Sequence, residues 1–184
     1  MIKRLAPIAT ARLALEPCRL RHLEVLLNNA EDFSAIFGWN IIPGYCESSG
    51  ALEFSLQKLK ERNSPSPWWA PFLVIHRRDK ALIGLAGYKG PPDPSGSVEI
   101  GYGIAPANRG KGLATETARA LMEYAFEDPT VRAVLAHTPP GENPSVSVLR
   151  KCGLKEMGSV MDRIDGKVTR WQMTRTAFQA HSVL

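Results

Sequence analysis

The residues best suited to chemistry in this chain form a short basic loop rich in glycine. Arg109 is followed by Gly110, Lys111 and Gly112, so two positions beside two cations carry no side chain. Backbone N–H groups at the start of a helix bind anions, because they donate hydrogen bonds and the helix dipole is positive there. The loop therefore predicts a binding site for a phosphate or a pyrophosphate.

The segments on either side of this loop predict a strand before it and a helix after it. Val98–Ile104 alternates large apolar residues with glutamate and glycine, which is the period of a strand, and Pro106 ends that strand. Thr115–Phe126 carries apolar residues at helical spacing. Gly101 and Gly103 indicate that another backbone approaches the strand closely, or else that they simply ease packing.

Two common phosphate-binding loops do not fit these residues. A Walker loop has Ser or Thr directly after its Gly-Lys pair, where this chain has Gly112. The dinucleotide-binding fingerprint of the Rossmann fold requires a third Gly or Ala at the position of Thr115. On its own, such a basic glycine loop is equally consistent with a solvated turn or a nucleic-acid contact.

A second motif follows the first, and the two together resemble one family. The apolar strand Ala133–Thr138 leads into Asn143-Pro144-Ser145, and a helical segment then runs to Gly153. Residues 109–114 resemble the R/Q-x-x-G-x-G/A loop of the GNAT superfamily of acetyl-CoA-dependent N-acetyltransferases. Residues 143–154 resemble the N-x-S…VL-x-K-x-G-F segment of the same family.

The resemblance extends from about Ala9 to about Arg175 and is closest to the branch that contains the ribosomal-protein N-terminal acetyltransferases. It implies an α/β (α+β) architecture, the GNAT fold, with a central mixed, mostly antiparallel sheet of six to seven strands and about four flanking helices. In this fold the strand before the loop and the strand after the long helix splay apart and admit the pantetheine arm. We expect residues 1–184 to form a single GNAT-like acetyltransferase domain.

The resemblance also implies acetyl-CoA as the co-substrate and assigns its contacts. Backbone amides of Arg109–Ala114 would bind the pyrophosphate, and the backbone of Tyr102–Ile104 would pair with pantetheine like an added strand. Asn143 would reach the pantetheine side, although an Asn before Pro is also a typical N-cap. No metal is expected, and the implied cofactor-binding residues are Tyr102, Gly103, Ile104, Arg109, Gly110, Lys111, Gly112, Leu113, Ala114 and Asn143.

Two side chains are candidates for the chemistry that the resemblance implies, direct attack of an amine on the thioester carbon. The amine needs a proton acceptor, and Glu99 is the candidate base, with a solvated or substrate-orienting carboxylate as the alternative. The tyrosine that acts on the thiolate in many family members is replaced by Leu149. Ser145, Tyr102 or a water would then serve, unless no side-chain acid is used. The implied catalytic residues are Glu99 and Ser145.

His137 and Cys152 are weaker candidates. A single histidine at a strand end is usually structural, although His137 would end its strand near the cleft. Cys152 is either a nucleophile for an acyl-enzyme or a core residue, and we favour the core because free cysteines usually pack there. We expect the aromatic segment 33–45 to select the acceptor.

The composition narrows the range of partners. Lys and Arg outnumber Asp and Glu by 23 to 18, and the net charge of +5 suits either nucleic acid or a cofactor with several phosphates. Because the charges are spread along the chain, nucleic acid is not expected as the main partner. No apolar run approaches the roughly 20 residues of a membrane helix. The three cysteines lack disulfide or zinc spacing, and we expect a cytoplasmic protein.

Two classes of function are consistent with these observations. The leading hypothesis is an N-acetyltransferase that acts on a primary amine, either a protein N-terminus or a small-molecule amine. The alternative is a non-catalytic acetyl-CoA-binding sensor or interaction domain, which the missing tyrosine keeps open. The expected partners are a small-molecule or peptide amine and no membrane, with a homodimer formed through an exposed sheet edge as a further option.

Overall fold

The computed structural model describes residues 5–46, 49–62, 66, 68–162 and 165–181. The strands are β1 (Ile8–Ala9), β2 (Leu13–Pro17), β3 (Asn40–Ile41), β4 (Phe72–His76), β5 (Ala81–Tyr88), β6 (Ser97–Ile104), β7 (Ala133–Thr138), β8 (Lys155–Asp162) and β9 (Gly166–Thr174). The α-helices are α1 (Leu20–Asn28), α2 (Phe33–Phe37), α3 (Ser49–Arg62), α4 (Leu113–Phe126), α5 (Pro144–Lys151) and α6 (Arg175–His181).

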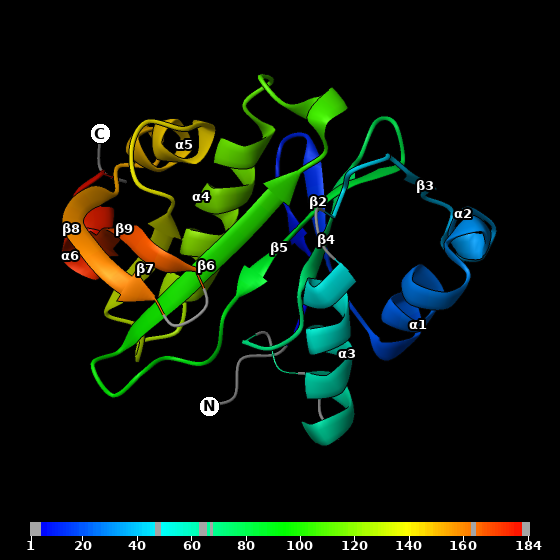
Figure 1. Ribbon diagram of the computed structural model, residues 1–184, viewed down its shortest axis with the longest axis horizontal. Coiled ribbons are helices and arrows are strands. Elements are labelled where there is room, and N and C mark those ends of the chain that lie inside the picture. Colours follow the sequence, from blue (N-terminus) through cyan, green and yellow to red (C-terminus); the bar gives the residue numbers. More distant parts are fainter. Residues whose placement is uncertain (1–4, 47–48, 63–65, 67, 163–164, 182–184) are drawn as a thin grey trace.

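The strands form one mixed sheet in the order β1-β2-β4-β5-β6-β7-β9-β8, with β3 paired to β5 outside this path. The β6–β7 and β3–β5 pairs are parallel and the others are antiparallel (Figure 1). The predicted mixed, mostly antiparallel α/β architecture is therefore confirmed. Among the described residues, the nine strands include the two-residue β1 and β3, and the short helices α2 and α6 were not predicted.

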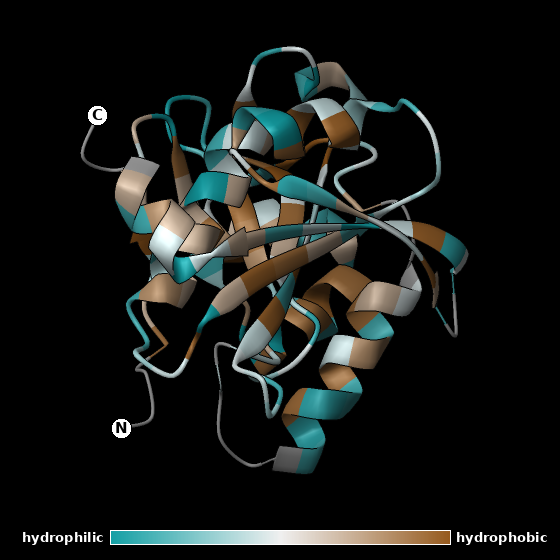
Figure 2. Cartoon of the chain, turned by 90° about the vertical axis from the view of Figure 1, so that its left-hand side faces the viewer, coloured by the Kyte–Doolittle hydropathy of each residue, from teal (hydrophilic) through white to brown (hydrophobic). Residues whose placement is uncertain are grey.

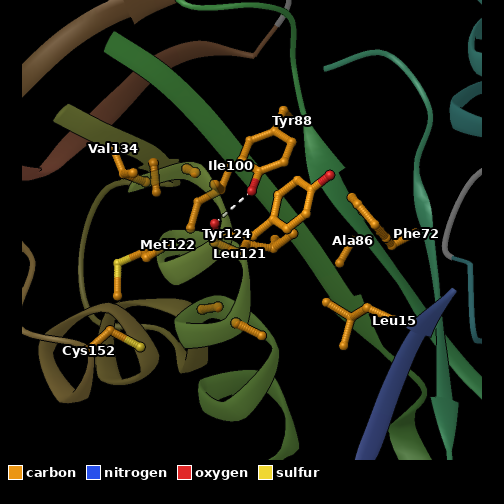
Figure 3. Packing of buried hydrophobic residues seen from close by; sticks show 14 of the residues in the cluster. Leu15, Phe72, Ala86, Tyr88, Ile100, Leu121, Met122, Tyr124, Val134 and Cys152 are labelled. Carbon is orange, nitrogen blue, oxygen red and sulfur yellow. Dashed lines mark hydrogen bonds between the residues drawn. The ribbon is translucent and has the colours of Figure 1, made fainter. Parts of the chain in front are cut away.

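Helices cover both faces of the sheet, and alternation along the strands supplies a core to each face. Leu13 and Leu15 of β2 pack in the cluster under α4 and α5, whereas Ala14 between them faces the cluster under α1, α2 and α3. The buried hydroxyl of Tyr88 donates a 2.6 Å hydrogen bond to the Leu121 carbonyl of α4 (Figure 3). Hydrophobic residues gather in the strands and on the inner helix faces (Figure 2).

The parallel contact between β6 and β7 is short. Its Cα partners end at Glu99 and Leu135. Beyond that point, β6 stays paired with β5 as far as Ile104, while β7 stays paired with β9 as far as Thr138. The two strands therefore diverge, as expected for the splayed pair. Within the described part of the chain, the edge of residues 100–104 that faces β7 has no strand partner.

The long helix after the glycine loop begins earlier than its apolar pattern predicts. It starts at Leu113 rather than Thr115, with Gly112 as its N-cap in the left-handed conformation. The helix therefore begins directly at the glycine loop, so its first N–H groups belong to the candidate anion site. No helix in the described ranges is long and apolar enough to cross a membrane.

Candidate functional site

The glycine loop has a backbone that favours glycine at two positions. Gly110 and Gly112 both have φ of +74°, in the left-handed region that L-residues rarely adopt. A Cβ atom at Gly110 would have no heavy atom within 4 Å, so space remains open beside the loop. The first four N–H groups of a helix lack intrahelical partners, and the N-cap residue Gly112 has no side chain that could accept hydrogen bonds from them. The N-terminal amides of α4 are thus available to an anion.

The cations of the loop bind carbonyls that precede it. Arg109 donates from Nε to the Ile104 carbonyl at 3.0 Å, and Lys111 donates from Nζ to the Ala107 carbonyl at 2.9 Å. The donors that an anion at the loop would meet are therefore the backbone N–H groups at the start of α4.

The loop is also held from outside by a residue that the sequence did not single out. Arg12 donates from Nη1 to the Lys111 carbonyl at 2.8 Å, and its Nε lies 2.7 Å from Glu116 Oε2 on α4. Arg12 thus connects the turn before β2 to both the loop and the helix. The sequence did not indicate this role for Arg12, because the contact joins segments about 100 residues apart.

Asn143 is an N-cap, which is the alternative considered for it. Its Oδ1 accepts from the Val146 N–H at 3.2 Å, and its Nδ2 donates to the carbonyls of Pro139 at 3.1 Å and Gly141 at 3.2 Å. Both ends of the amide side chain are therefore committed to shaping the turn before α5. A contact between Asn143 and pantetheine stays a prediction.

A cavity of about 110 Å³ lies in the gap between the splayed strands. It reaches both sides of the sheet, because Ile100 and Ala136 belong to the core under α4 and α5, whereas Glu99 and His137 alternate to the opposite face. The two residues implied in catalysis, Glu99 and Ser145, are brought together here. The cavity is lined by Lys89, Glu99, Ile100, Gly101, Tyr102, Ala136, His137, Thr138, Ser145 and Leu149.

Glu99 does not stand alone in this cavity. Its Oε1 lies 2.7 Å from Lys89 Nζ and 3.0 Å from His137 Nδ1. Both contacts are short, although neither Glu99 Oε1 nor His137 Nδ1 forms a hydrogen bond with the described residues. The strand register explains the cluster: the Lys89 N–H donates to the Glu99 carbonyl at 2.9 Å, and Glu99 pairs with Leu135, two residues before His137 on the same face.

Lys89 is held in its charged form by this cluster. Burial lowers the pKa of Lys89, but the interaction with Glu99 and the charges of Asp165 and Asp162 outweigh it, so the net shift is upward. The ammonium lies half-exposed between Glu99 and Asp165, whose Oδ2 is 3.9 Å away. Lys89 was not predicted as a site residue. The register between β5 and β6 would have indicated it, because it makes Lys89 a cross-strand neighbour of Glu99.

Tyr102 presents an unsatisfied hydroxyl to the site. The oxygen is buried and forms no hydrogen bond with the described residues. Burial, with a smaller contribution from Cys152, raises the pKa of Tyr102 and keeps the phenol protonated. Leu149, at the position of the family's tyrosine, is 1% exposed and lines the same cavity. The site therefore retains a phenol, although it comes from β6 rather than from α5.

Cys152 belongs to the hydrophobic core, as the preferred interpretation expects. It is 7% exposed and packs in the cluster under α4 and α5. Burial raises the pKa of its thiol to about 11, against a weaker opposing effect of Arg119. A protonated, enclosed thiol is a poor nucleophile.

A second and larger cavity, of about 410 Å³, lies on the far side of the glycine loop. It lies between the turn that joins β1 to β2 and the first turns of α4, and its lining includes Arg12, Gly112 and Glu116. Neither Glu99 nor Ser145 borders it. Of these two cavities, the smaller one in the splay is lined by both residues implied in catalysis.

Comparison with known proteins identifies the family. Residues 12–155 match the model of the acetyltransferase (GNAT) domain. The chain belongs to this acetyltransferase family and is an acyltransferase enzyme. A relative described as an uncharacterized N-acetyltransferase, p20 of Bacillus licheniformis, is 26% identical over 153 residues, which cover 83% of this chain and 84% of that protein.

Solved structures share the fold at low identity. The ribosomal alpha-N-protein acetyltransferase RimL in complex with coenzyme A has a TM-score of 0.67 and 15% identity, over 94% of this chain and 99% of that one. The aminoglycoside acetyltransferase AAC(6')-Ib with coenzyme A has a TM-score of 0.66 and 21% identity, over 92% and 99% of the two chains. Both neighbours bind coenzyme A, and their acceptors differ.

Proposed function

We propose that this protein transfers the acetyl group of acetyl-CoA to a primary amine by direct attack. The observation that carries the proposal is the succession of three features along β6 and the loop that follows it. They are Glu99 in the cavity, the edge of residues 100–104 that has no strand partner in the described part of the chain, and the exposed amides of Gly110–Ala114. A carboxylate suits proton removal, a free strand edge suits a pantetheine arm, and exposed amides suit a pyrophosphate.

The residues present fit coenzyme A. The pyrophosphate would accept hydrogen bonds from the loop amides, beside Arg109 and Lys111. The pantetheine amides would pair with the free edge of β6, as an added strand pairs with the edge of a sheet. This arrangement would put the thioester at the cavity that holds Tyr102 and Ser145. When bound, acetyl-CoA supplies the activated acetyl group.

The groups around the cavity suit the two proton transfers of the reaction. An amine reaches the site as an ammonium and must lose a proton before it attacks, so a proton acceptor is needed on the acceptor side. The Glu99 cluster occupies that side. The departing thiolate needs a donor on the other side, where Tyr102 and Ser145 lie. Tyr102 is the better candidate for this donor, as a relay that gives its proton to the sulfur and takes up one from the amine, because its hydroxyl is enclosed and has no other described partner.

The acceptor would approach over the strand face opposite α4. Gly101 and Gly103 lie on this face, and a Cβ atom at either position would meet nothing within 4 Å. This open floor supports an acceptor groove above β6. Small-molecule and peptide amines both fit this proposal, and the structural relatives include enzymes named for each class.

The test is release of free thiol from acetyl-CoA in the presence of a panel of amines and N-terminal peptides. We expect amine-dependent thiol release and coenzyme A to raise the melting temperature. Gly110→Ala should weaken coenzyme A binding, because its φ of +74° strains an alanine and the new Cβ fills the anion site. The matched control is Gly38→Ala, with φ of +75° and equally open surroundings far from the loop.

Outcomes of this test separate the alternatives. Binding of coenzyme A without thiol release by any amine would favour the non-catalytic sensor. Equal losses of binding in Gly110→Ala and Gly38→Ala would contradict the loop assignment, because both variants carry the same backbone strain.

A further inference from the structure

We propose that His137 is the catalytic residue that accepts the proton of the acceptor amine, and that Glu99 is a positioning residue that orients the imidazole. This inference rests on the proposed acetyl transfer and deepens it. It begins from one contact, in which His137 Nδ1 lies 3.0 Å from Glu99 Oε1. His137 is on β7, two residues beyond Leu135, the last residue of β7 that pairs with β6. A carboxylate held against one imidazole nitrogen is the arrangement that orients a histidine base.

One carboxylate oxygen of Glu99, Oε1, already lies against two other charged or polar groups. Oε1 faces the ammonium of Lys89 at 2.7 Å as well as the imidazole of His137. A proton arriving at this oxygen would have to compete with a permanent cation. Ordinary imidazole takes up a proton about two pH units above an ordinary carboxylate, and therefore matches a base that works near neutral pH. The ion pair thus favours Glu99 as an anionic anchor rather than as the proton acceptor.

The two ring nitrogens of His137 have different surroundings. Nδ1 is enclosed and lies against Glu99. Nε2 forms no hydrogen bond with the described residues and is not enclosed in this way, while the ring itself lines the cavity. With the Nδ1–H directed at Glu99, the lone pair of Nε2 is left for the incoming ammonium. The two atoms are in close contact without a hydrogen bond between them, and catalytic hydrogen bonds often become short and well aligned only when substrate binds.

Charges of both signs lie around the His137 imidazole. Glu99 places a negative charge beside the ring, whereas Lys89 and the cross-strand neighbour of His137 on β9, Arg170, place positive charges near it. Among the described residues, the titratable and charged groups around His137 are Glu99 on β6, Lys89 after β5, Arg170 on β9, Asp165 in the turn before β9 and Tyr102 across the cavity, while α5 contributes the uncharged Ser145 and Leu149.

The proton balance is complete with these groups. Nε2 of His137 takes one proton from the ammonium, and the nitrogen lone pair forms the new N–C bond as the C–S bond breaks. The sulfur leaves with the electron pair of that bond. The second proton of the amine passes to the sulfur, through Tyr102 or water, and the imidazolium releases its proton to solvent. The products are the acetylated amine and the free thiol of coenzyme A.

Kinetics distinguish the two candidate bases. We expect His137→Asn to lower kcat/KM for the amine by about 10²–10⁴-fold and to remove the acidic limb of its pH profile. Glu99→Gln keeps an oxygen that can accept from Nδ1, so it should lower the rate less and retain that limb. The matched control is His76→Asn, which removes another partly buried imidazole whose Nδ1 lies 2.8 Å from a carboxylate, that of Asp79. It should leave the profile unchanged.

Loss of the acidic limb in Glu99→Gln, with the limb retained in His137→Asn, would overturn the inference and return the base to Glu99. Chemical rescue provides an independent check, because restored activity shows that the missing imidazole, and not a misfolded variant, caused the loss. Added imidazole should restore thiol release to His137→Ala but not to Glu99→Ala. Failure of rescue, together with coenzyme A binding at the wild-type level, would also contradict the assignment.

A measurement without substrate separates this inference from the proposed function. In ¹⁵N-NMR spectra of the free protein, the His137 ring should be the Nδ1–H tautomer at pH 8 and should lose that preference in Glu99→Ala. The Nε2–H tautomer in the wild type would refute the orienting role, whatever the enzyme activity. Conversely, the Nδ1–H tautomer without any amine-dependent turnover would refute the proposed acetyl transfer while leaving the Glu99–His137 pairing intact.

Discussion

Arg12 and Lys111 are joined by a 2.8 Å hydrogen bond from the Arg12 guanidinium to the Lys111 carbonyl, which anchors the glycine loop to the turn before β2. The same guanidinium lies 2.7 Å from Glu116 in the first turn of α4. The loop conformation that exposes the candidate anion-binding amides is therefore supported from outside the two sequence motifs.

Arg12→Met should weaken coenzyme A binding without removing a ligand of the pyrophosphate. The variant keeps the apolar stem of the side chain but frees the Lys111 carbonyl, so the loop gains conformational freedom that binding must then remove. Loss of a charge-assisted hydrogen bond costs about 1.5–3 kcal/mol, which corresponds to roughly a 10- to 150-fold rise in the Kd. Calorimetric titration measures it, with the exposed Arg78→Met as the control. An unchanged Kd would remove the supporting role.

Glu116 should make the stability of the protein sensitive to acid. Burial raises the pKa of Glu116, but hydrogen bonds from Thr10 and Arg12 outweigh it and hold that pKa below its usual value. A carboxyl with a lowered folded pKa stabilises the protein above its unfolded pKa, and this contribution is lost as the pH falls through the folded pKa. Urea unfolding between pH 6 and pH 3 should therefore show a smaller acid-induced loss in Glu116→Gln than in the wild type. Identical pH slopes would contradict the contribution of this carboxyl.

Much of this framework was predictable from the sequence, and the reasons are local. The alternation in Val98–Ile104 predicts a strand and the spacing after the loop predicts a helix, because each pattern repeats over several residues. The glycines of the loop indicate a backbone conformation that other residues rarely adopt. The pairing of Glu99 with Lys89 and His137 was not predictable, because it depends on the registers of two strand pairs. Asn143 was ambiguous for a different reason: capping and ligand contact require the same residue type, and only the geometry shows that its side chain caps α5.

Tyr102→Phe should lower the rate of the reaction without lowering the stability of the fold. The Tyr102 hydroxyl has no hydrogen-bond partner among the described residues, so its removal should leave the free energy of unfolding unchanged or slightly higher. If this hydroxyl protonates the thiolate, kcat for thiol release should fall by about 10-fold or more. Ser145→Ala, at the other candidate donor, should then have the smaller effect on kcat. The reverse order of the two variants would assign the donor to Ser145.

Gly101→Ala should impair acceptor binding while leaving the fold intact. A Cβ atom at this position would meet nothing within 4 Å, and the backbone is ordinary strand, so neither a clash nor strain is expected. The methyl group would instead project over the face from which the amine approaches. We expect a higher KM for the amine, an unchanged melting temperature and unchanged coenzyme A affinity. A lower melting temperature with an unchanged KM would indicate that the glycine serves packing.

The central claim is that bare amides at the start of α4 and the free edge of β6 together hold an acyl-CoA in the splay. A crystal structure of the protein with coenzyme A tests it directly. We predict pyrophosphate oxygens within hydrogen-bond distance of N–H groups in residues 110–114, and pantetheine alongside residues 100–104. Pyrophosphate bound away from that loop, or pantetheine outside the gap between β6 and β7, would contradict it.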